Sequence, residues 1–442
     1  MYFLYNVGLF LVLVLAAPYL LYQAVVHKKY LANLTARLGL SPIKFSSPIN
    51  KPVILIHCVS VGEFLAAEVL IEQIHKNLPT YQIIITTTTT TGQHLAKERA
   101  SKFAEICYFP LDFAFAVKKF FAQVNPVAIV IMETEIWPQF FHIASENRIP
   151  ILIANGRISD RSFPRYKLLK FLLVRTLSLV TKFMMQSTQD AERILALGAP
   201  PNSVLVSGNI KYDFGTQEQS KRLDLIAIKL DKLLNLSQNA PLLVFGSTTP
   251  GEEELLLAAY QRLLQDKLLA NTRLLIVPRR PERFAEVANL LTSQNIKFTH
   301  RSKLDDSKNN NQIEQVILLD SIGELAAVYR FATVVFVGGS LVPYGGHNIL
   351  EPALYQRAII TGSYMNNFHQ IIKDFLAAKA VIQLPALEKQ ELILEITEKL
   401  SYLLKNESAN KQLGENAYQV IAKNRGALTQ QLEVILDIVN KK

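Results

Sequence analysis

Residues 51–68, KPVILIHCVSVGEFLAAE, contain the junction that decides the fold. Their apolar first half predicts a buried strand, and their second half has the apolar spacing of a helix. At the junction Ser60 and Glu63 stand three residues apart, as in a capping box, with Gly62 between them. A strand that passes through a glycine into a helix is typical of α/β proteins, which bind ligands beyond the carboxyl ends of their strands. Two interpretations of Glu63 therefore stay open, a helix cap and a group that performs chemistry.

The same alternation of short Val- and Ile-rich runs with longer helical stretches continues along the chain in two series. Each series predicts a mostly parallel sheet wound with helices on both faces. A long polar, helix-forming stretch separates the two series. We therefore expect an α/β protein with two Rossmann-like, doubly wound domains that face a cleft. The predicted segments are 1–27, 28–208, a joint at 209–240, 241–410 and C-terminal helices at 411–442.

The first segment carries no charged residue from Tyr2 to Val26, which is long enough for a helix that crosses a bilayer. Lys28 and Lys29 follow it, and no Lys or Arg precedes it. A cleavable signal peptide has a basic start and a shorter apolar core, so the pattern predicts an uncleaved membrane anchor over 1–27. The basic flank predicts that the body lies in the cytoplasm. A segment that lies on the membrane surface is the alternative.

The chain has 442 residues and a formal net charge of +10, which indicates an acidic partner. Nucleic acid is disfavoured because the sequence has no dense Lys/Arg run with interleaved aromatic residues. Cys58 and Cys107 have neither metal-ligand spacing nor a disulfide pattern, and no His/Asp cluster has metal spacing. The dinucleotide fingerprint and the lysine-containing phosphate loop are absent from the sequence. A nucleotide that is bound without a metal or other cofactor agrees with these observations.

Residues 333–362 carry the strongest ligand pattern, a strand, a Gly-Gly-Ser turn, a second Gly-Gly pair and a helix. Gly338 and Gly339 predict a close approach of backbone amides to a ligand. Gly345–Asn348 would open the next helix, whose free N–H groups suit a phosphate. Glu351, one turn further on, could accept hydrogen bonds from ribose hydroxyls. Tight turns with an asparagine cap are the structural alternative.

Arg279 follows Pro278 at the end of an expected strand, where a guanidinium could bind a phosphate in a bidentate manner. Gly323 stands in a second capping-box pattern and could let a nucleotide base approach the backbone. Three more candidates stand at an expected strand end or at the end of the first domain: Glu133, Glu135 and Lys211. Surface charges and helix starts are the alternative interpretation of these residues.

Six motifs together resemble the bacterial 3-deoxy-D-manno-octulosonic acid (Kdo) transferases of lipopolysaccharide assembly. They are SVGE (60–63), METEIWP (132–138), GNIKYD (208–213), PRRPERF (278–284), DSIGEL (320–325) and GGSLVPYGGHNILEP (338–352), in the family's order and spacing. The resemblance implies a GT-B fold at the cytoplasmic side of the bacterial inner membrane. It also implies that domain 28–208 binds a lipid A precursor (lipid IVA) and that domain 241–410 binds the donor, CMP-Kdo.

The resemblance implies that Glu63 is the general base and that Glu133 and Lys211 stabilise the transition state. With the glycine turns, the expected donor site comprises Pro278, Arg279, Ile322, Gly323, Glu324, Gly338, Gly339, Gly346, His347, Asn348, Ile349, Leu350 and Glu351. Direct attack assisted by one base predicts an inverting glycosyltransferase that needs no metal. Two alternatives stay open: an epimerase or other sugar-nucleotide enzyme on the same fold, and a membrane-tethered scaffold that binds a nucleotide or lipid without turnover.

Overall fold

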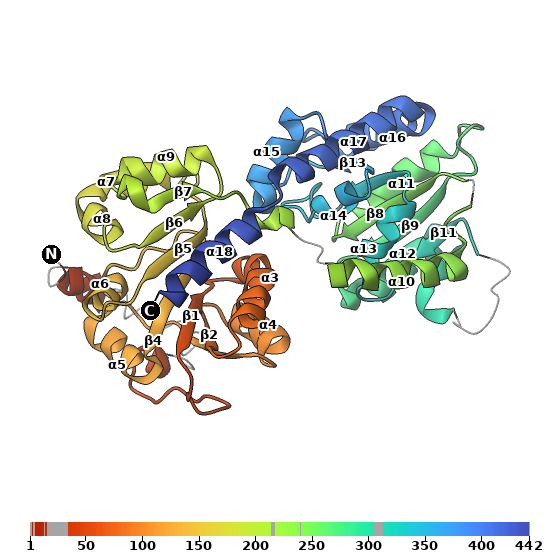
Figure 1. Ribbon diagram of the computed structural model, residues 1–442. Helices are drawn as coiled ribbons and strands as arrows, with labels where there is room; N and C mark the ends of the chain where they lie inside the picture. The colour runs from red at the N-terminus through yellow and green to blue at the C-terminus, as the bar shows by residue number, and fades with distance from the viewer. Residues whose placement is uncertain are drawn as a thin grey trace. The chain divides into compact units, whose positions relative to one another are not determined.

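The computed structural model describes residues 2, 5–12, 14, 15, 34–213, 217–238, 240–304 and 313–441. The chain forms two compact units, Met1–Phe214 together with Asn424–Lys442, and Gly215–Lys423. Each unit is built on its own parallel sheet with helices on both faces (Figure 1). The prediction of two doubly wound α/β domains is therefore confirmed.

The first sheet has seven parallel strands in the order β3-β2-β1-β4-β5-β6-β7. They are β1 (Val53–His57), β2 (Gln82–Thr87), β3 (Ala104–Tyr108), β4 (Pro126–Met132), β5 (Ile151–Gly156), β6 (Lys182–Met185) and β7 (Val204–Val206). All five residues of β1 are buried, as expected for a parallel strand covered on both faces. The strand order reverses between β1 and β4, and such a switch point is where open α/β sheets bind ligands.

Helices cover both faces of the first sheet and create two apolar cores. They are α2 (Leu34–Arg37), α3 (Val61–Asn77), α4 (Thr90–Ala100), α5 (Ala114–Val124), α6 (Pro138–Glu146), α7 (Phe163–Leu168), α8 (Lys170–Leu177), α9 (Thr188–Leu197) and α18 (Ala427–Asn440), with 3-10 turns η1 (Pro201–Ser203) and η2 (Ile210–Asp213). Phe140 of α6 and Leu173 of α8 lie in one core. Phe64 of α3 and Ile435 of α18 lie in the other.

The second sheet also has seven strands, in the order β10-β11-β9-β8-β12-β13-β14, and all neighbours are parallel. They are β8 (Leu242–Thr248), β9 (Arg273–Pro278), β10 (Phe298–His300), β11 (Val316–Leu318), β12 (Val334–Val337), β13 (Ala358–Thr361) and β14 (Ile382–Gln383). Its order reverses between β8 and β12, which places the ends of β8, β9 and β12 at the switch point.

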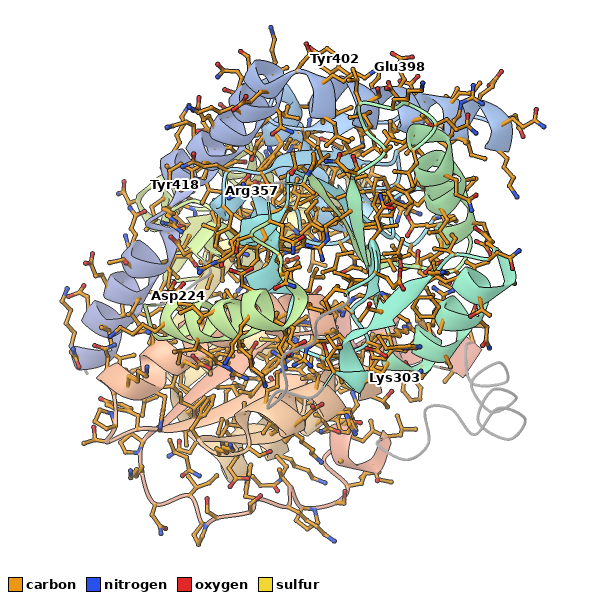
Figure 2. All side chains as sticks on the ribbon, turned by 90° about the vertical axis from the view of Figure 1, so that its right-hand side faces the viewer. Asp224, Lys303, Arg357, Glu398, Tyr402 and Tyr418 are labelled. Atoms are coloured by element: carbon orange, nitrogen blue, oxygen red, sulfur yellow. The ribbon has the colours of Figure 1, made fainter. Side chains whose placement is uncertain are left out.

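The helices of the second unit alternate with its strands and short 3-10 turns. They are α10 (Gln217–Leu234), α11 (Glu253–Leu263), α12 (Phe284–Ser293), α13 (Leu325–Val328), α14 (Leu350–Leu354), α15 (His369–Ala377), α16 (Lys389–Lys405) and α17 (Glu407–Asn424), with η3 (Pro281–Arg283), η4 (Arg301–Lys303), η5 (Tyr329–Phe331) and η6 (Asn366–Phe368). Glu398 and Tyr402 point outward from α16 (Figure 2), whereas Ile396 and Leu400 on its other side are buried. This one-sided burial is the amphipathic pattern of a helix that covers a sheet.

The division of the chain differs from the predicted segments in two places. Helix α10, expected in the joint at 209–240, belongs to the second unit, because its Ala227 and Leu230 are fully buried there. Helix α18, expected in a separate block at 411–442, belongs to the first unit and lies against it (Figure 1). Asp213 accepts hydrogen bonds from the backbone N–H groups of Gly426 (2.6 Å) and Leu428 (2.7 Å), which hold the start of α18.

Residues 1, 3, 4, 13 and 16–27 of the predicted membrane anchor lie outside the described residues. In the part of the chain that the structure describes, no helix is both long enough and apolar enough to cross a membrane. The described residues of this segment contact the first unit. The Tyr5 hydroxyl donates to Asp112 (2.9 Å), and the Asn6 amide donates to Gln139 (3.0 Å).

Candidate active site

Glu63 stands in the first turn of α3, directly beyond the carboxyl end of β1. Its side chain is buried, and its Oε2 accepts a hydrogen bond from the backbone N–H of Val59 at 2.7 Å. Ser60 is the N-cap, but its hydroxyl makes no capping bond within the described structure. The expected capping box is therefore not formed among the described residues, because the carboxylate binds the N–H of Val59 and not that of the N-cap Ser60. The Val59 bond holds the acid of Glu63 at the switch point of the first sheet.

Glu133 follows β4, the strand beside β1, and has a left-handed backbone (φ 55°). A non-glycine residue in this conformation costs about 1–3 kcal/mol, and such residues cluster at functional sites. The Glu133 N–H donates to the Ala154 carbonyl (2.8 Å), which holds the turn in place. Its carboxylate accepts a hydrogen bond from the Arg157 Nε at 2.6 Å and lies 3.8 Å from the Lys211 Nζ. Two cations therefore balance this buried acid.

Burial is the largest cause of each pKa shift in this cluster. Burial, with the nearby charges of Glu133 and Glu135, raises the pKa of Glu63 to about 8. Burial and the charge of Glu133 raise the pKa of Glu135 to about 7. Burial also lowers the pKa of Lys211, an effect that the charge of Glu133 partly opposes. A carboxyl group whose pKa lies near physiological pH is suited to general acid–base catalysis.

The first unit thus brings together Glu63, Glu133 and Lys211, which the sequence had placed in three separate motifs. It adds Glu135, a sequence candidate, and Arg157, for which the sequence alone indicated no role. The available signal for Arg157 was its place directly after Gly156, the last residue of β5. Because β5 neighbours β4, a residue at its carboxyl end lies beside Glu133.

Lys211 is positioned by a network that no local motif predicts. It lies in η2, whose backbone is linked to the sheet by Asn155, because the Asn155 Oδ1 accepts the N–H of Ile210 at 3.1 Å. The fully buried Gln431 of α18 accepts the Asn155 N–H at 2.9 Å and donates to the Ser207 hydroxyl at 2.9 Å. The last helix of the chain therefore fixes the turn that carries Lys211.

In the second unit, Arg279 follows Pro278, the buried last residue of β9, and its backbone N–H donates to the Thr248 carbonyl at 2.9 Å. Its side chain is exposed, and its charge acts on two residues of the neighbouring turn. Burial, and secondarily Arg279, lowers the pKa of His347 to about 4. Burial raises the pKa of Glu351, which Arg279 partly offsets. Arg279, His347 and Glu351 thus form one electrostatic cluster at the carboxyl end of the sheet.

His347 lies against Gly339, where an added Cβ would stand 2.8 Å from the imidazole. Its buried Nε2 has no hydrogen-bond partner among the residues that the structure describes. With a pKa of about 4 the ring is neutral at physiological pH, so a ligand group could satisfy this nitrogen without an ionic bond.

The expected helix over Gly345–Asn348 begins later, at Leu350, and α14 has only five residues. The Asn348 amide donates to Glu351 Oε1 (3.1 Å), and the Asn348 Oδ1 accepts the N–H of Leu350 (3.1 Å). Asn348 therefore forms a local side-chain turn just before α14, whose N-cap is Ile349, and it also orients Glu351. The side chains of Ile349 and Leu350 are buried in the core, so only their backbone could reach a ligand.

The expectation that the Gly338–Gly339 amides bind a ligand is wrong, because other groups of the chain occupy them. The Gly338 N–H donates to the Gly246 carbonyl at 2.8 Å. The N–H groups of Gly339, Ser340 and Leu341 donate to the carboxylate of Glu252 at 2.7, 2.9 and 2.9 Å. That carboxylate is fully buried. The turn is an anion-binding loop whose anion belongs to the protein itself.

Gly338 and Gly346 are among the glycines of this region that have a steric reason. A Cβ on Gly338 would stand 2.5 Å from the Ser247 carbonyl oxygen. Gly346 has a left-handed backbone (φ 76°), and its Cβ would stand 2.2 Å from the Met365 sulfur. A larger residue would therefore meet fixed backbone at Gly338, and at Gly346 it would meet both an unfavourable backbone conformation and the Met365 side chain.

The Ile322–Glu324 turn divides into a fixed end and an exposed tip. Glu324 accepts hydrogen bonds from Arg301 Nε (3.1 Å) and Nη2 (3.0 Å), and also from the Ser321 hydroxyl. Ile322 is 79% exposed, and Gly323 is exposed with a left-handed backbone (φ 82°). Glu324 therefore fits its structural interpretation, and the tip alone is free to contact a ligand.

The described residues contain no group of three or more His, Cys, Asp or Glu side chains that could hold a metal ion. Cys58 and Cys107 are buried free thiols.

A buried acid at the switch point of one parallel sheet, with a cationic turn region at the switch point of a second, defines a two-domain enzyme of the sugar-nucleotide glycosyltransferase class. The fold agrees with that of a UDP-GlcNAc 2-epimerase from Neisseria meningitidis bound to UDP-GlcNAc, with a TM-score of 0.54 at 12% identity. That likeness covers 88% of this chain and 100% of the other, and it shows the fold alone.

Sequence comparison identifies the family. The model of the 3-deoxy-D-manno-octulosonic-acid transferase (kdotransferase) family matches residues 32–214. The 3-deoxy-D-manno-octulosonic acid transferase of Haemophilus influenzae is 36% identical over 387 residues, which is 86% of each chain. That of Rickettsia felis is 30% identical over 397 residues, 89% of this chain and 81% of the relative. The chain belongs to this family, and it is a glycosyltransferase that transfers Kdo in lipopolysaccharide synthesis.

Proposed function

We propose that the chain is an inverting, metal-independent transferase that moves Kdo from CMP-Kdo to a lipid A precursor, lipid IVA, with Glu63 as general base. One observation carries the proposal. Glu63 is a buried acid with a pKa of about 8, held at the end of β1 by a single backbone hydrogen bond. One hydrogen bond leaves the carboxylate with oxygen lone pairs for an acceptor hydroxyl.

In the proposed reaction, ionised Glu63 takes the proton from an acceptor hydroxyl while that oxygen attacks the anomeric carbon of Kdo. The new bond joins the acceptor oxygen to this carbon. The bond from the carbon to the CMP phosphate breaks, and CMP leaves with its electrons. Attack on the face opposite the leaving group inverts the anomeric configuration. The proton remains on Glu63 until solvent removes it.

Lys211 and Arg157 supply positive charge beside the reacting groups, and Glu133 positions them. The Arg157–Glu133 ion pair is short, whereas Lys211 lies 3.8 Å from the same acid and keeps donors for substrate oxygens. Positive groups fixed in a poorly hydrated site stabilise developing negative charge more strongly than they would in water.

For the donor, we propose that Arg279 binds the single phosphate of CMP-Kdo and that Glu351 accepts ribose hydroxyls. His347 would donate or accept at Nε2 as a neutral ring, and the Ile322–Gly323 tip would contact the base. Two observations support this: Arg279 is exposed and its charge acts on His347, and the buried Nε2 of His347 has no hydrogen-bond partner among the described residues. One phosphate needs only a few such contacts, and the proposal requires no metal.

We also propose that the enzyme works at the bacterial inner membrane, with 1–27 as its anchor and its catalytic body on the cytoplasmic side. The support is the uncharged stretch from Tyr2 to Val26 and the basic residues that follow it. A lipid acceptor requires an enzyme at a membrane.

The test is Kdo transfer by the wild type and by Glu63→Gln, with CMP-Kdo made in situ and lipid IVA as acceptor, while CMP binding is measured on both. Glu146→Gln, an exposed acid of α6, is the control. We expect loss of transfer of 10²-fold or more for Glu63→Gln, because general base catalysis contributes about 10²–10⁴-fold. CMP binding should persist. Transfer at the wild-type rate would refute Glu63 as the base. A soluble product formed without any lipid would indicate an epimerase. If the wild type binds CMP but shows no turnover, the protein would instead be a scaffold.

A further inference from the structure

The region around α7 and α8 has an unusual charge pattern. Residues 161–189 contain no Asp or Glu, although acids are common elsewhere in the chain. The basic residues of this stretch are Arg161, Arg165, Lys167, Lys170, Arg175 and Lys182. A stretch of this length with positive charges only is typical of a surface that meets anions.

The same two helices expose large apolar side chains. Leu168 is 81% exposed, Phe171 78%, Leu169 47% and Val174 41%. Helix α8 already buries Leu173 and Leu177 against the core of the first unit. Its outer face therefore carries apolar residues where a helix in contact with water normally carries polar ones.

The N-terminal segment begins near these helices and is itself apolar. The Tyr2 ring stacks on His142 of α6 at 3.8 Å. The Arg175 guanidinium of α8 lies over the same Tyr2 ring, 5.7 Å from its centre. The segment therefore starts beside α8. Its exposed apolar side chains include Phe10 (58%), Leu11 (55%), Val12 (61%), Val14 (51%) and Leu15 (81%).

We propose that α7 and α8 form a membrane-insertion surface that docks on an anionic lipid bilayer, independently of any spanning anchor. Leu168, Leu169, Phe171 and Val174 would enter the acyl region. The exposed Arg165, Lys167, Lys170 and Arg175 would bind lipid phosphates. An amphipathic element with basic and large apolar side chains binds bilayers in this way. The inference rests on the proposed membrane location and adds to it the surface that makes the contact.

This surface lies next to the proposed active site. Tyr166, on the inner side of α7, packs against the core. Burial raises the Tyr166 pKa, and the negative charge of Glu135 adds to that effect, which places α7 beside the carboxylate cluster. A bilayer docked on the outer side of α7 and α8 would therefore bring lipid headgroups close to Glu135 and its neighbours. That is where an enzyme with a lipid acceptor needs them.

Site-specific labelling tests the proposal on the full-length protein. The chain has two cysteines, Cys58 and Cys107, and both are buried, so a cysteine introduced by Phe171→Cys can be labelled selectively with a polarity-sensitive dye. Leu225→Cys on α10, where Leu225 is 71% exposed, is the matched control in the second unit. The probes are vesicles of phosphatidylglycerol and phosphatidylethanolamine, and vesicles of phosphatidylcholine alone.

We expect the dye at position 171 to shift to the blue and brighten with anionic vesicles, and the dye at position 225 to stay unchanged. If the protein sediments with these vesicles while the dye at position 171 stays unchanged, the proposal is overturned, although the membrane location stands. If the dye is already blue-shifted without vesicles, another part of the chain or a second copy covers the surface, and the proposal is overturned as well.

Charge removal gives a second, independent readout. Lys167→Gln with Lys170→Gln should weaken binding to anionic vesicles roughly 30-fold, since each lysine near such a surface contributes about 1 kcal/mol. Lys221→Gln with Lys232→Gln on α10 is the control pair. Kdo transfer to lipid IVA in detergent should stay at the wild-type level for both pairs. Equal vesicle binding by the two pairs would contradict the proposal, whereas an inactive wild type in detergent would instead count against the proposed function.

Discussion

The Nε of Arg157 donates a hydrogen bond to the Oε2 of Glu133 at 2.6 Å. This bond joins the turn after β5 to the turn after β4, and it holds Glu133 in its left-handed backbone beside the buried Glu63. The charge of Arg157 lowers the pKa of Glu63, while that of Glu133 raises it. The basicity of the proposed base Glu63, which burial raises most, is therefore adjusted by two residues that contact each other.

Removing the cation of this pair should change the pH dependence of the enzyme. We expect Arg157→Gln to move the midpoint of the transfer rate against pH upward, because Glu63 would lose a positive neighbour that favours its ionised form. The rate at pH 7 should fall by an order of magnitude or more. Arg99→Gln, which removes an exposed ion pair with Glu68 in the same unit, is the control. An unchanged pH profile for Arg157→Gln would contradict the role of this pair.

Glu63 itself should make stability depend on pH. Its folded pKa of about 8 lies above the ordinary value of 4.5. Between these values the folded protein binds more protons than the unfolded chain, so the free energy of unfolding falls as pH rises from 4.5 to 8. In Glu63→Gln this pH-dependent loss should be absent. The free energy of unfolding of the variant, relative to that of the wild type, should therefore increase by about 1–4 kcal/mol as the pH rises from 5 to 8.5. Denaturant unfolding at both pH values measures it, with Glu146→Gln as control. An identical gain for both variants would show that Glu63 is not the source.

Glu252 should stabilise the turn beside the donor site. We expect Glu252→Gln to lower the free energy of unfolding by about 2–4 kcal/mol, because a neutral amide replaces a carboxylate that accepts several buried hydrogen bonds. CMP affinity should fall as the Gly339–Leu341 loop loosens. Glu254→Gln, two residues away and exposed, is the matched control. Denaturant titration and calorimetry with CMP are the measurements. If Glu252→Gln had the free energy of unfolding and the CMP affinity of the wild type, the loop would not depend on this carboxylate.

Arg279 should contribute to donor binding without supporting the fold. We expect Arg279→Gln to weaken CMP binding roughly 10- to 150-fold, because a hydrogen bond to a charged group contributes about 1.5–3 kcal/mol. The pKa of His347 should rise, since Arg279 lowers it, and NMR titration of the histidines can follow this change. The adjacent and exposed Arg280 offers the control Arg280→Gln. If the two variants lost the same CMP affinity, the effect would come from the net positive charge of this region and not from a specific contact of Arg279.

Gly346 and Gly323 offer a comparison of steric effects at matched backbone geometry. Both have left-handed backbones (φ 76° and 82°), so an alanine costs backbone strain at either position. Only at Gly346 would the new Cβ meet a neighbour, the Met365 sulfur at 2.2 Å, whereas no described atom lies within 4 Å at Gly323. We expect Gly346→Ala to be about 1–3 kcal/mol less stable than Gly323→Ala in denaturant unfolding. Equal stability would mean that the Met365 side chain moves aside freely.

The sequence by itself determined the two parallel α/β sheets and the acids at their strand ends. Short apolar runs alternate with helical stretches, and this alternation leaves few topologies other than doubly wound sheets. Glu63 and Glu133 could each be predicted at the carboxyl end of a buried strand, and the family resemblance implied their roles. Local spacing also sufficed for the tight turn at Asn348, since that turn involves residues only two positions apart.

Only the tertiary structure decided which charged groups meet. Glu252 stands 87 residues from Gly339 in the chain, yet its carboxylate takes the amides that the glycine pattern had suggested for a ligand. Gln431 holds the Lys211 turn from the last helix, 224 residues from Ser207. The physical reason is that strand order and helix packing bring such partners together through burial. A periodic apolar pattern states which faces are buried, but it does not state which distant polar group must satisfy a given buried amide.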